Sequence, residues 1–141
     1  MLAYATMSRI IDFGNGGPSD NIFLALSYSV SDICTKIYNG TVSYSFTCTS
    51  SPLIQLNTWY HIANVFSGTT SYIYVNGNLV SSGTQYVPKN VIRNKNYFGK
   101  SNWANSNVKG SFDDLRIYNG ALSAEQILND YTLSSNNGIV F

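Results

Sequence analysis

The chain has 141 residues, of which 44% are hydrophobic and 14% aromatic, so it is long and apolar enough to bury a core. Only 11% of the residues are charged and the net charge is +1, which excludes the basic surface of a nucleic-acid-binding or anionic-membrane-binding protein. Ser, Thr, Asn and Tyr supply the polar surface instead, and such a surface favours neutral, hydroxyl-rich partners. No apolar run approaches the roughly 18 residues of a membrane-spanning helix, so we expect no membrane insertion.

The first third of the chain predicts short antiparallel strands. Residues 1–13 are interpreted as an edge strand, with Met7–Phe13 as its best part, and residues 21–29 as the next strand. Asn39-Gly40 then separates two further runs, 32–38 and 41–47, and predicts a tight hairpin, because a type I′ turn needs positive φ at both central residues. Asn39 also begins an Asn-Gly-Thr sequon, which makes it a candidate glycosylation site.

Of the two cysteines, Cys34 lies on the first arm of this hairpin and Cys48 directly follows the second. A two-residue turn places Cys34 opposite Ser45, so Cys48 is three residues out of register, too far for a disulfide without a bulge or a longer loop. An even cysteine count in a β-protein rich in Ser, Thr and Asn suits an oxidising compartment. A Cys34–Cys48 disulfide and two free thiols therefore both remain open.

The central stretch gives the clearest strand pattern. Runs rich in β-branched and aromatic residues at 59–66 and 71–75 flank a short loop, and Asn76-Gly77 leads into a third short run at 78–80. Three strands without an intervening helix exclude a parallel α/β sheet.

The last third predicts a loop at 91–96, a short strand at 97–99, a polar loop at 101–109 and a final strand at Ser111–Tyr118. Ser123 and Gln126 form a capping box that starts a helix to about Tyr131, and the tail 133–141 ends in Gly138-Ile139-Val140-Phe141, which is again strand-like. We therefore expect one all-β domain over residues 1–141, an antiparallel β-sandwich of jelly-roll type with one short C-terminal helix. The predicted core consists of Ile11, Leu24, Leu26, Trp59, Ile62, Val65, Ile73, Val75, Leu79, Phe98, Phe112, Leu115, Ile117, Leu122 and Ile127.

A series of short motifs covers most of the chain in a fixed order. They are Trp59-Tyr60-His61-Ile62-Ala63, Tyr72-Ile73-Tyr74-Val75-Asn76-Gly77, Phe98-Gly99, Gly110-Ser111-Phe112-Asp113-Asp114-Leu115-Arg116-Ile117-Tyr118-Asn119, Ala121-Leu122-Ser123 and Glu125-Gln126-Ile127. Together they resemble the concanavalin A-like lectin/glucanase superfamily, specifically its laminin G-like and pentraxin-like jelly rolls, from about Arg9 to Tyr131.

The chain departs from this family at its N-terminal side. Family members usually have one or two further strands before the counterpart of Arg9–Gly14, and without them the sheet has an unpaired edge. Three ways of filling the gap remain open. The sequence is a fragment of a longer chain, or the tail 136–141 folds back as a strand, or an edge or tail completes the sheet of another copy.

Glucanases share this fold, but the chain lacks their carboxylate arrangement. Its single glutamate, Glu125, lies in the predicted helix, and Asp113 and Asp114 are adjacent, so on a strand they point to opposite faces. His61 is the only histidine, and we expect it to have a hydrogen-bonded structural role. We therefore expect that the chain is not an enzyme.

The resemblance implies two kinds of site. Sandwiches of this family often hold a structural calcium ion, for which Asp113 is the matching ligand, and we expect no other cofactor. For a sugar ring, the candidates are aromatic and amide side chains in polar loops, namely Trp103, Asn102, Asn105, Tyr86 and Tyr97. A tryptophan in a loop is, alternatively, a lid over the core.

Two functions follow from the sequence. The first is a secreted, non-catalytic module that binds carbohydrate or a matrix glycoconjugate. The second is a structural or interaction module of an extracellular assembly, with another extracellular protein or a second copy as its partner and no sugar site.

Overall fold

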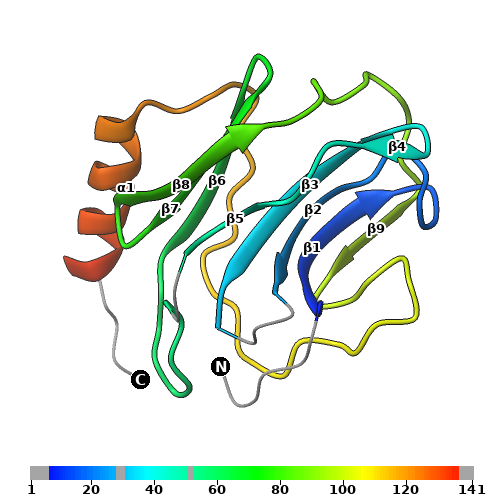
Figure 1. Ribbon diagram of the computed structural model, residues 1–141. Coiled ribbons are helices and arrows are strands. Elements are labelled where there is room, and N and C mark those ends of the chain that lie inside the picture. Colours follow the sequence, from blue (N-terminus) through cyan, green and yellow to red (C-terminus); the bar gives the residue numbers. More distant parts are fainter. Residues whose placement is uncertain (1–6, 28–30, 51–52, 137–141) are drawn as a thin grey trace.

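The computed structural model describes residues 7–27, 31–50 and 53–136, and within them two antiparallel sheets form the layers of a β-sandwich, with one helix outside the smaller sheet (Figure 1). The predicted fold class, an antiparallel sandwich of jelly-roll type with a short C-terminal helix, is confirmed. The strands are β1 (Arg9–Gly14), β2 (Ile22–Leu26), β3 (Ile33–Asn39), β4 (Val42–Ser43), β5 (Thr47–Cys48), β6 (Ile62–Ser67), β7 (Thr70–Val75), β8 (Asn78–Thr84) and β9 (Lys95–Phe98), and the helix is α1 (Ala124–Asn136).

The larger sheet has the order β4-β3-β2-β1-β9, and β5 pairs with β3 beside β4. The prediction that the first strand lies at an edge is wrong, because β1 pairs with β2 on one side and with β9 on the other. Residues 95 and 96, predicted as loop, belong to β9 and extend its pairing along β1 as far as Gly14. Residues 1–6 of the predicted first strand lie outside the described residues.

The smaller sheet is the meander β6-β7-β8. Asn76 and Gly77 have φ of 50° and 77°, as a type I′ hairpin turn requires, so the predicted turn is confirmed. β8 continues to Thr84, four residues beyond its predicted end, because it remains paired with β7 as far as Thr70.

The hairpin that carries the cysteines has a different register from the predicted one. Asn39 pairs with Val42, so the two turn residues are Gly40, with φ of 66°, and Thr41. Between β4 and β5 the chain leaves β3 and returns shifted by one residue, which places Cys34 opposite Cys48. The two form a disulfide with their Cα atoms 4.1 Å apart. A turn moved by one residue and an irregularity thus remove the mismatch that the sequence implied.

The main hydrophobic cluster, Leu24, Ile33, Ile54, Ile73 and Val75, lies between the two sheets, and the buried residues differ in part from the predicted core. Leu24, Leu26, Ile73, Val75 and Ile127 are buried as predicted. Ile11, Ile62, Val65 and Leu122 are half-buried. The remaining predicted core residues are exposed, so for them the prediction is wrong: Trp59, Leu79, Phe98, Phe112, Leu115 and Ile117.

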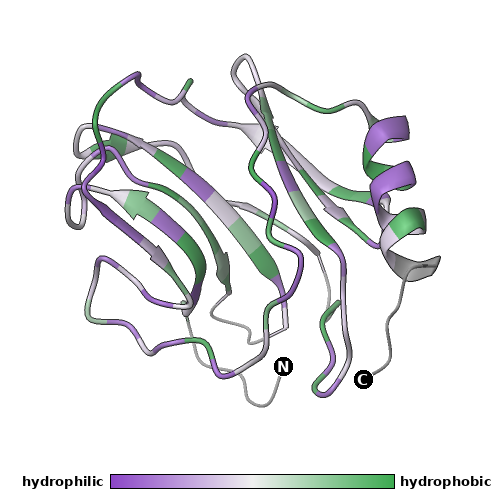
Figure 2. Cartoon of the chain, turned by 180° about the vertical axis from the view of Figure 1, so that it is seen from behind, coloured by the Kyte–Doolittle hydropathy of each residue, from purple (hydrophilic) through white to green (hydrophobic). Residues whose placement is uncertain are grey.

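The exposed residues include three from the predicted last strand. Residues 111–118 form no strand, and in both views they run as an unpaired trace between the two sheets (Figures 1 and 2). Arg116 contacts Asp130 of α1 at 3.3 Å, and the Tyr118 hydroxyl donates to the same carboxylate at 2.7 Å. The segment is therefore held from the helix side, while no described neighbouring strand gives its backbone a partner.

The helix begins with the predicted capping box. The Gln126 N–H donates to the Ser123 hydroxyl at 3.2 Å, and the Ser123 N–H donates to the Gln126 side chain at 2.8 Å. α1 extends to Asn136 rather than to Tyr131, so the first residues of the tail, 133–136, are helical, and its strand-like end lies outside the described residues.

Candidate functional site

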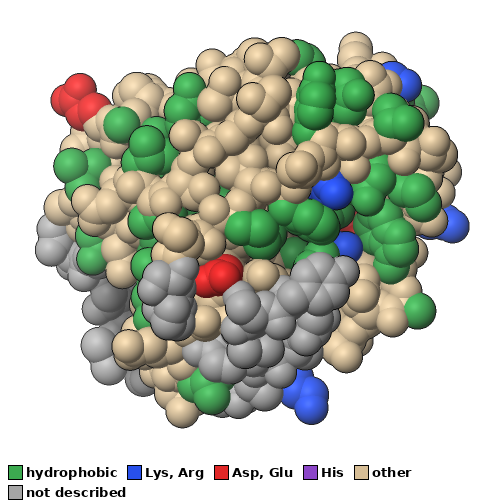
Figure 3. Space-filling view, viewed as in Figure 1, with side chains coloured by type: hydrophobic (Ala, Val, Ile, Leu, Met, Phe, Trp, Pro, Cys, Tyr) green, Lys and Arg blue, Asp and Glu red, His purple; other side chains and the backbone are tan. Residues whose placement is uncertain are grey.

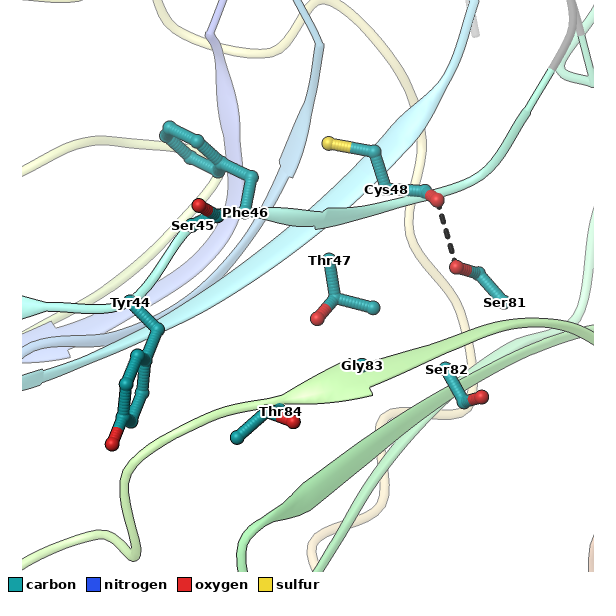
Figure 4. A pocket seen from close by; sticks show the side chains of 9 residues that line it. All are labelled: Tyr44, Ser45, Phe46, Thr47, Cys48, Ser81, Ser82, Gly83 and Thr84. Carbon is teal, nitrogen blue, oxygen red and sulfur yellow. Dashed lines mark hydrogen bonds between the residues drawn. The ribbon is translucent and has the colours of Figure 1, made fainter.

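A groove of about 380 Å³ lies where the edge of the smaller sheet meets the cysteine hairpin. One wall is residues 44–48, which span the irregularity between β4 and β5, and the other wall is residues 81–84 at the end of β8 (Figure 4). Thr47 points from the first wall toward Gly83 on the second, whereas Phe46 and Cys48 point to the opposite side (Figure 4).

Side-chain hydrogen bonds hold the two walls together in place of a backbone ladder. The Ser81 hydroxyl donates to the Cys48 carbonyl at 2.7 Å, and the Gln85 amide donates to the Ser45 carbonyl and the Thr47 hydroxyl, both at 3.0 Å. A side chain at Gly83 would collide with Thr47, so glycine is needed for this close approach. The groove is therefore fixed by the fold and does not have to form when a ligand arrives.

A pair of tyrosines stands at the groove. Tyr44, which lines it, stacks on Tyr86 with ring centroids 4.4 Å apart and an interplanar angle of 24°. The residue is nevertheless 48% exposed, which leaves aromatic surface open to a ligand. Because Tyr86 already orders its ring, Tyr44 offers a flat surface whose orientation loses little entropy on binding.

The loop that follows Tyr86 is tied to the larger sheet. Lys89 pairs with Asp20 at 3.5 Å, and the Arg93 guanidinium donates to the Asp20 carbonyl at 2.8 Å. The Gly40 N–H also donates to the Asp20 carboxylate, and this bond, more than the nearby lysine, lowers the pKa of Asp20. These contacts anchor the segment that carries Tyr86.

The groove lining is uncharged. Its residues are Tyr44, Ser45, Phe46, Thr47, Cys48, Ser81, Ser82, Gly83 and Thr84, so it offers hydroxyls, backbone groups and aromatic surface, but no carboxylate, histidine, lysine or arginine. Such a lining can hydrogen-bond a neutral ligand without desolvating an ion.

Trp103, the leading candidate from the sequence, lies in a different place. Its ring packs 5.8 Å from the Phe23 ring and 5.7 Å from the Tyr38 ring, over a hydrophobic cluster that also includes Met7. Trp103 therefore acts as a lid, which is the alternative that the sequence left open.

The two amide candidates beside Trp103 have structural partners. Asn102 donates through its backbone and side chain to the buried Asp12 carboxylate, at 2.8 and 2.9 Å, and the Asn105 side-chain oxygen accepts from the Ser101 hydroxyl at 3.1 Å. They hold the loop that carries Trp103 against the larger sheet. The Oδ1 atom of Asn102 is the exception, because it is buried and has no partner among the described residues.

Of the remaining candidates, only Tyr86 reaches the groove region. Tyr97 lies on β9, and the ammonium group of Lys100 lies 4.7 Å from the centre of its ring. Sequence reasoning missed Tyr44 and the hydroxyls of Ser82 and Thr84. The signal that could have found Tyr44 is its position in an irregular, hydroxyl-rich stretch next to the Asn-Gly turn.

The described residues do not form a calcium site around Asp113. This side chain is exposed and accepts the backbone N–H of Asp114 at 2.8 Å. Within residues 7–27, 31–50 and 53–136, no group of three or more His, Cys, Asp or Glu side chains could hold a metal ion. Calcium needs six to eight oxygen ligands, so the residues present do not fit it.

His61 directly precedes β6, and its ring lies 5.8 Å from the ring of Tyr131. Its Nδ1 atom is buried and has no hydrogen-bond partner in the described part of the chain, so the expected hydrogen-bonded role is not seen at this atom. Burial lowers the pKa of His61, and the nearby Asp130 opposes this shift.

Comparison with known proteins identifies the family. The model of the concanavalin A-like lectin/glucanases superfamily, in its laminin G form, matches residues 3–128. The chain belongs to this superfamily. Its domains are of an extracellular binding type, and the resemblance deduced from the motifs is confirmed.

Other comparisons add less. A solved structure of an S-layer domain-containing protein from Clostridium thermocellum ATCC 27405 (residues 221–444) is similar to this chain, with 25% sequence identity and a TM-score of 0.44. The match covers 93% of this chain, which spans 65% of the length of that one. A search of curated proteins found no match. No helix in the described residues is long and apolar enough to cross a membrane.

Proposed function

We propose that the chain is a non-catalytic, extracellular module that binds neutral carbohydrate in the groove between residues 44–48 and 81–84. The observation that carries this proposal is the stacked Tyr44–Tyr86 pair beside an uncharged, hydroxyl-rich groove. A sugar ring presents apolar C–H groups to an aromatic face and hydroxyls to neighbouring polar groups, and this arrangement provides both.

Three further observations support the proposal. The superfamily includes lectins. The disulfide suits an oxidising compartment outside the cytosol. The face of the molecule in Figure 3 is dominated by uncharged atoms, with few charged side chains, so it suits a neutral ligand better than a charged one.

The test is a glycan array with and without calcium, followed by calorimetry on any glycan that binds. The Tyr44→Ala variant should weaken binding at least about tenfold, because it removes the aromatic surface, whereas Tyr97→Ala removes a tyrosine elsewhere and should leave binding unchanged. Trp103→Ala should lower the melting temperature, because Trp103 covers a hydrophobic cluster, and should weaken glycan binding less than Tyr44→Ala does. Absence of any glycan signal in both buffers, or equal binding by wild type and Tyr44→Ala, would refute the proposal.

The second candidate function is a structural module of an extracellular assembly. One observation favours it: among the described residues, neither the outer edge of β6 nor residues 111–118 pair with a further strand. An array without glycan signal would favour this second function.

A further inference from the structure

Three loops meet at the end of the molecule that carries the tyrosine pair. They are the loop between β1 and β2, the turn between β3 and β4, and the loop after β8, which passes beside β4 on its way to β9 (Figure 1). Asp20 lies in the first of these loops and contacts the other two. Tyr44, in turn, follows the β3–β4 hairpin, and Tyr86 begins the loop after β8, so Asp20 is connected to the segments of both stacked rings.

Asp20 holds the hairpin that leads to Tyr44. Its N–H donates to the Gly40 carbonyl at 2.9 Å, and the Gly40 N–H donates back to the Asp20 carboxylate at 2.6 Å. A hydrogen bond to a carboxylate is roughly twice as strong as one between neutral groups. The ladder of the hairpin is short, because β4 ends at Ser43 and Tyr44 follows directly. The bonds to Gly40 therefore supply much of what fixes this hairpin.

The same residue holds the loop that begins with Tyr86. The Lys89 ammonium group lies 3.5 Å from the Asp20 carboxylate. The Arg93 guanidinium donates to the Asp20 carbonyl at 2.8 Å and to the Lys89 carbonyl at 3.1 Å, so it joins the two members of the ion pair. Lys89 is 45% exposed, and an ion pair of this kind contributes little by itself. The pair and the two Arg93 bonds together restrain the backbone that follows Tyr86.

The backbone of Asp20 is shaped for contacts in two directions. Its φ is 51°, in the left-handed region that Asp and Asn tolerate better than most residues. In this conformation its N–H bonds to the hairpin, while its carbonyl accepts from Arg93 of the other loop. Asp20 thus contacts both loops through its backbone as well as through its carboxylate.

We propose that Asp20 is a positioning residue for the ligand groove, which holds the segments of Tyr44 and Tyr86 at the separation at which their rings stack. This inference rests on the proposed function, because it concerns the same site. Asp20 is not part of the groove lining, so its effect on a ligand is transmitted through the two tyrosines. Without its carboxylate, the ligand has to order the aromatic platform when it binds, and this lowers the affinity.

Replacing Asp20 by glycine tests the proposal. Asp20→Gly removes the carboxylate, and glycine accepts the positive φ without strain. In protein with isotope-labelled tyrosine, nuclear Overhauser effects between the Tyr44 and Tyr86 rings should be strong in the wild type and weak in the variant. Calorimetry uses the neutral oligosaccharide that gives the strongest array signal, and its dissociation constant should rise about threefold to tenfold.

Asp114→Gly is the matched control. Asp114 also has a positive φ, 49°, and an ion pair, with Arg116 at 2.7 Å, but it lies in the segment that contacts α1. The two substitutions are therefore alike in type, and only Asp20→Gly should change the ring contacts and the affinity. Asp20→Asn is the conservative variant. Its amide oxygen can still accept from Gly40, so it should retain most of both signals.

Two results would overturn the proposal: ring contacts in Asp20→Gly as strong as in the control, or an affinity equal to that of the control. If Asp20→Gly does not fold, Arg93→Met breaks the same connection from the other loop and should also weaken the ring contacts. Unchanged ring contacts in Arg93→Met would then overturn it. If the wild type binds no glycan, the proposed function fails, whereas the ring contacts still decide whether Asp20 positions the pair.

Discussion

The two edges of the smaller sheet differ in the contacts that they make with the rest of the molecule. At the β8 edge, side chains cross to the larger sheet, and Gln85, which is buried, joins Ile37, Ser45 and Thr47. At the β6 edge, residues 111–118 run nearby without a backbone hydrogen bond to a strand. One edge is therefore closed by side chains and keeps a groove, while the other has no further strand partner in the part of the chain that the structure describes.

The difference between the two edges lies in what replaces the backbone ladder. Side chains that replace a backbone ladder leave space between the walls, and this space is the proposed ligand groove. Exposed backbone groups that have no ladder can bond to water or pair with another strand.

Removing the Gln85 side chain should have the largest effect on stability. Gln85→Ala deletes hydrogen bonds to the Ile37 N–H, the Ser45 carbonyl and the Thr47 hydroxyl, and leaves buried polar groups unsatisfied. We expect the free energy of unfolding to fall by about 4 kcal/mol. Thermal and urea unfolding measure it, with the exposed Gln55→Ala as control. Equal stability of the two variants would show that this edge is not closed by Gln85.

Opening the Cys34–Cys48 disulfide should have the next largest effect. The bridge joins residues 14 apart in sequence and fixes one wall of the groove. Loss of a cross-link that closes a loop of this size should lower the free energy of unfolding by about 3 kcal/mol. Urea unfolding with and without reductant measures the change, and the Cys34→Ala/Cys48→Ala variant should not respond to reductant. A urea midpoint of the wild type that does not change with reductant would contradict the prediction.

Shortening the exposed Ile117 side chain should have little effect on the free energy of unfolding. Ile117→Ala removes an exposed side chain, so we expect a change below about 0.5 kcal/mol in dilute solution. A loss of several kcal/mol in dilute solution would mean that this side chain is already packed.

The smallest effect should be a pH dependence from His61. Burial lowers its pKa in the folded state, so the unfolded chain binds the proton more strongly. The stability contribution is therefore complete above the unfolded pKa of about 6.5 and is lost as the pH falls below it toward the folded pKa. Melting curves of wild type and His61→Gln between about pH 7.5 and pH 5 should converge as the pH falls. Parallel curves would contradict the prediction.

The sequence predicts the fold well where a turn or a cap fixes it locally. Asn76-Gly77 and the box at Ser123 both have the predicted geometry. It fails for residues 111–118, whose alternating pattern is that of a strand, because strand formation needs a neighbour that local sequence does not supply. The same limit explains why Leu115 and Ile117 were placed in the core.

The candidate site was harder to predict because it depends on register. The position of Tyr44 in the groove follows from the turn at Gly40-Thr41 and from the shift between β4 and β5, and neither is encoded by a local motif. Trp103 had the residue type expected of a sugar platform, but its neighbours Phe23 and Tyr38 come from distant strands and make it a lid.

Amide hydrogen exchange tests most directly the central claim that the smaller sheet has one closed edge and one open edge. In dilute solution the amides of Ile37 and Gln85, which donate to the Gln85 side chain and to the Thr69 carbonyl, should be protected, and those of residues 112–118 should exchange rapidly. Strong protection of 112–118 in the dilute monomer, or rapid exchange at Ile37 and Gln85, would contradict the account.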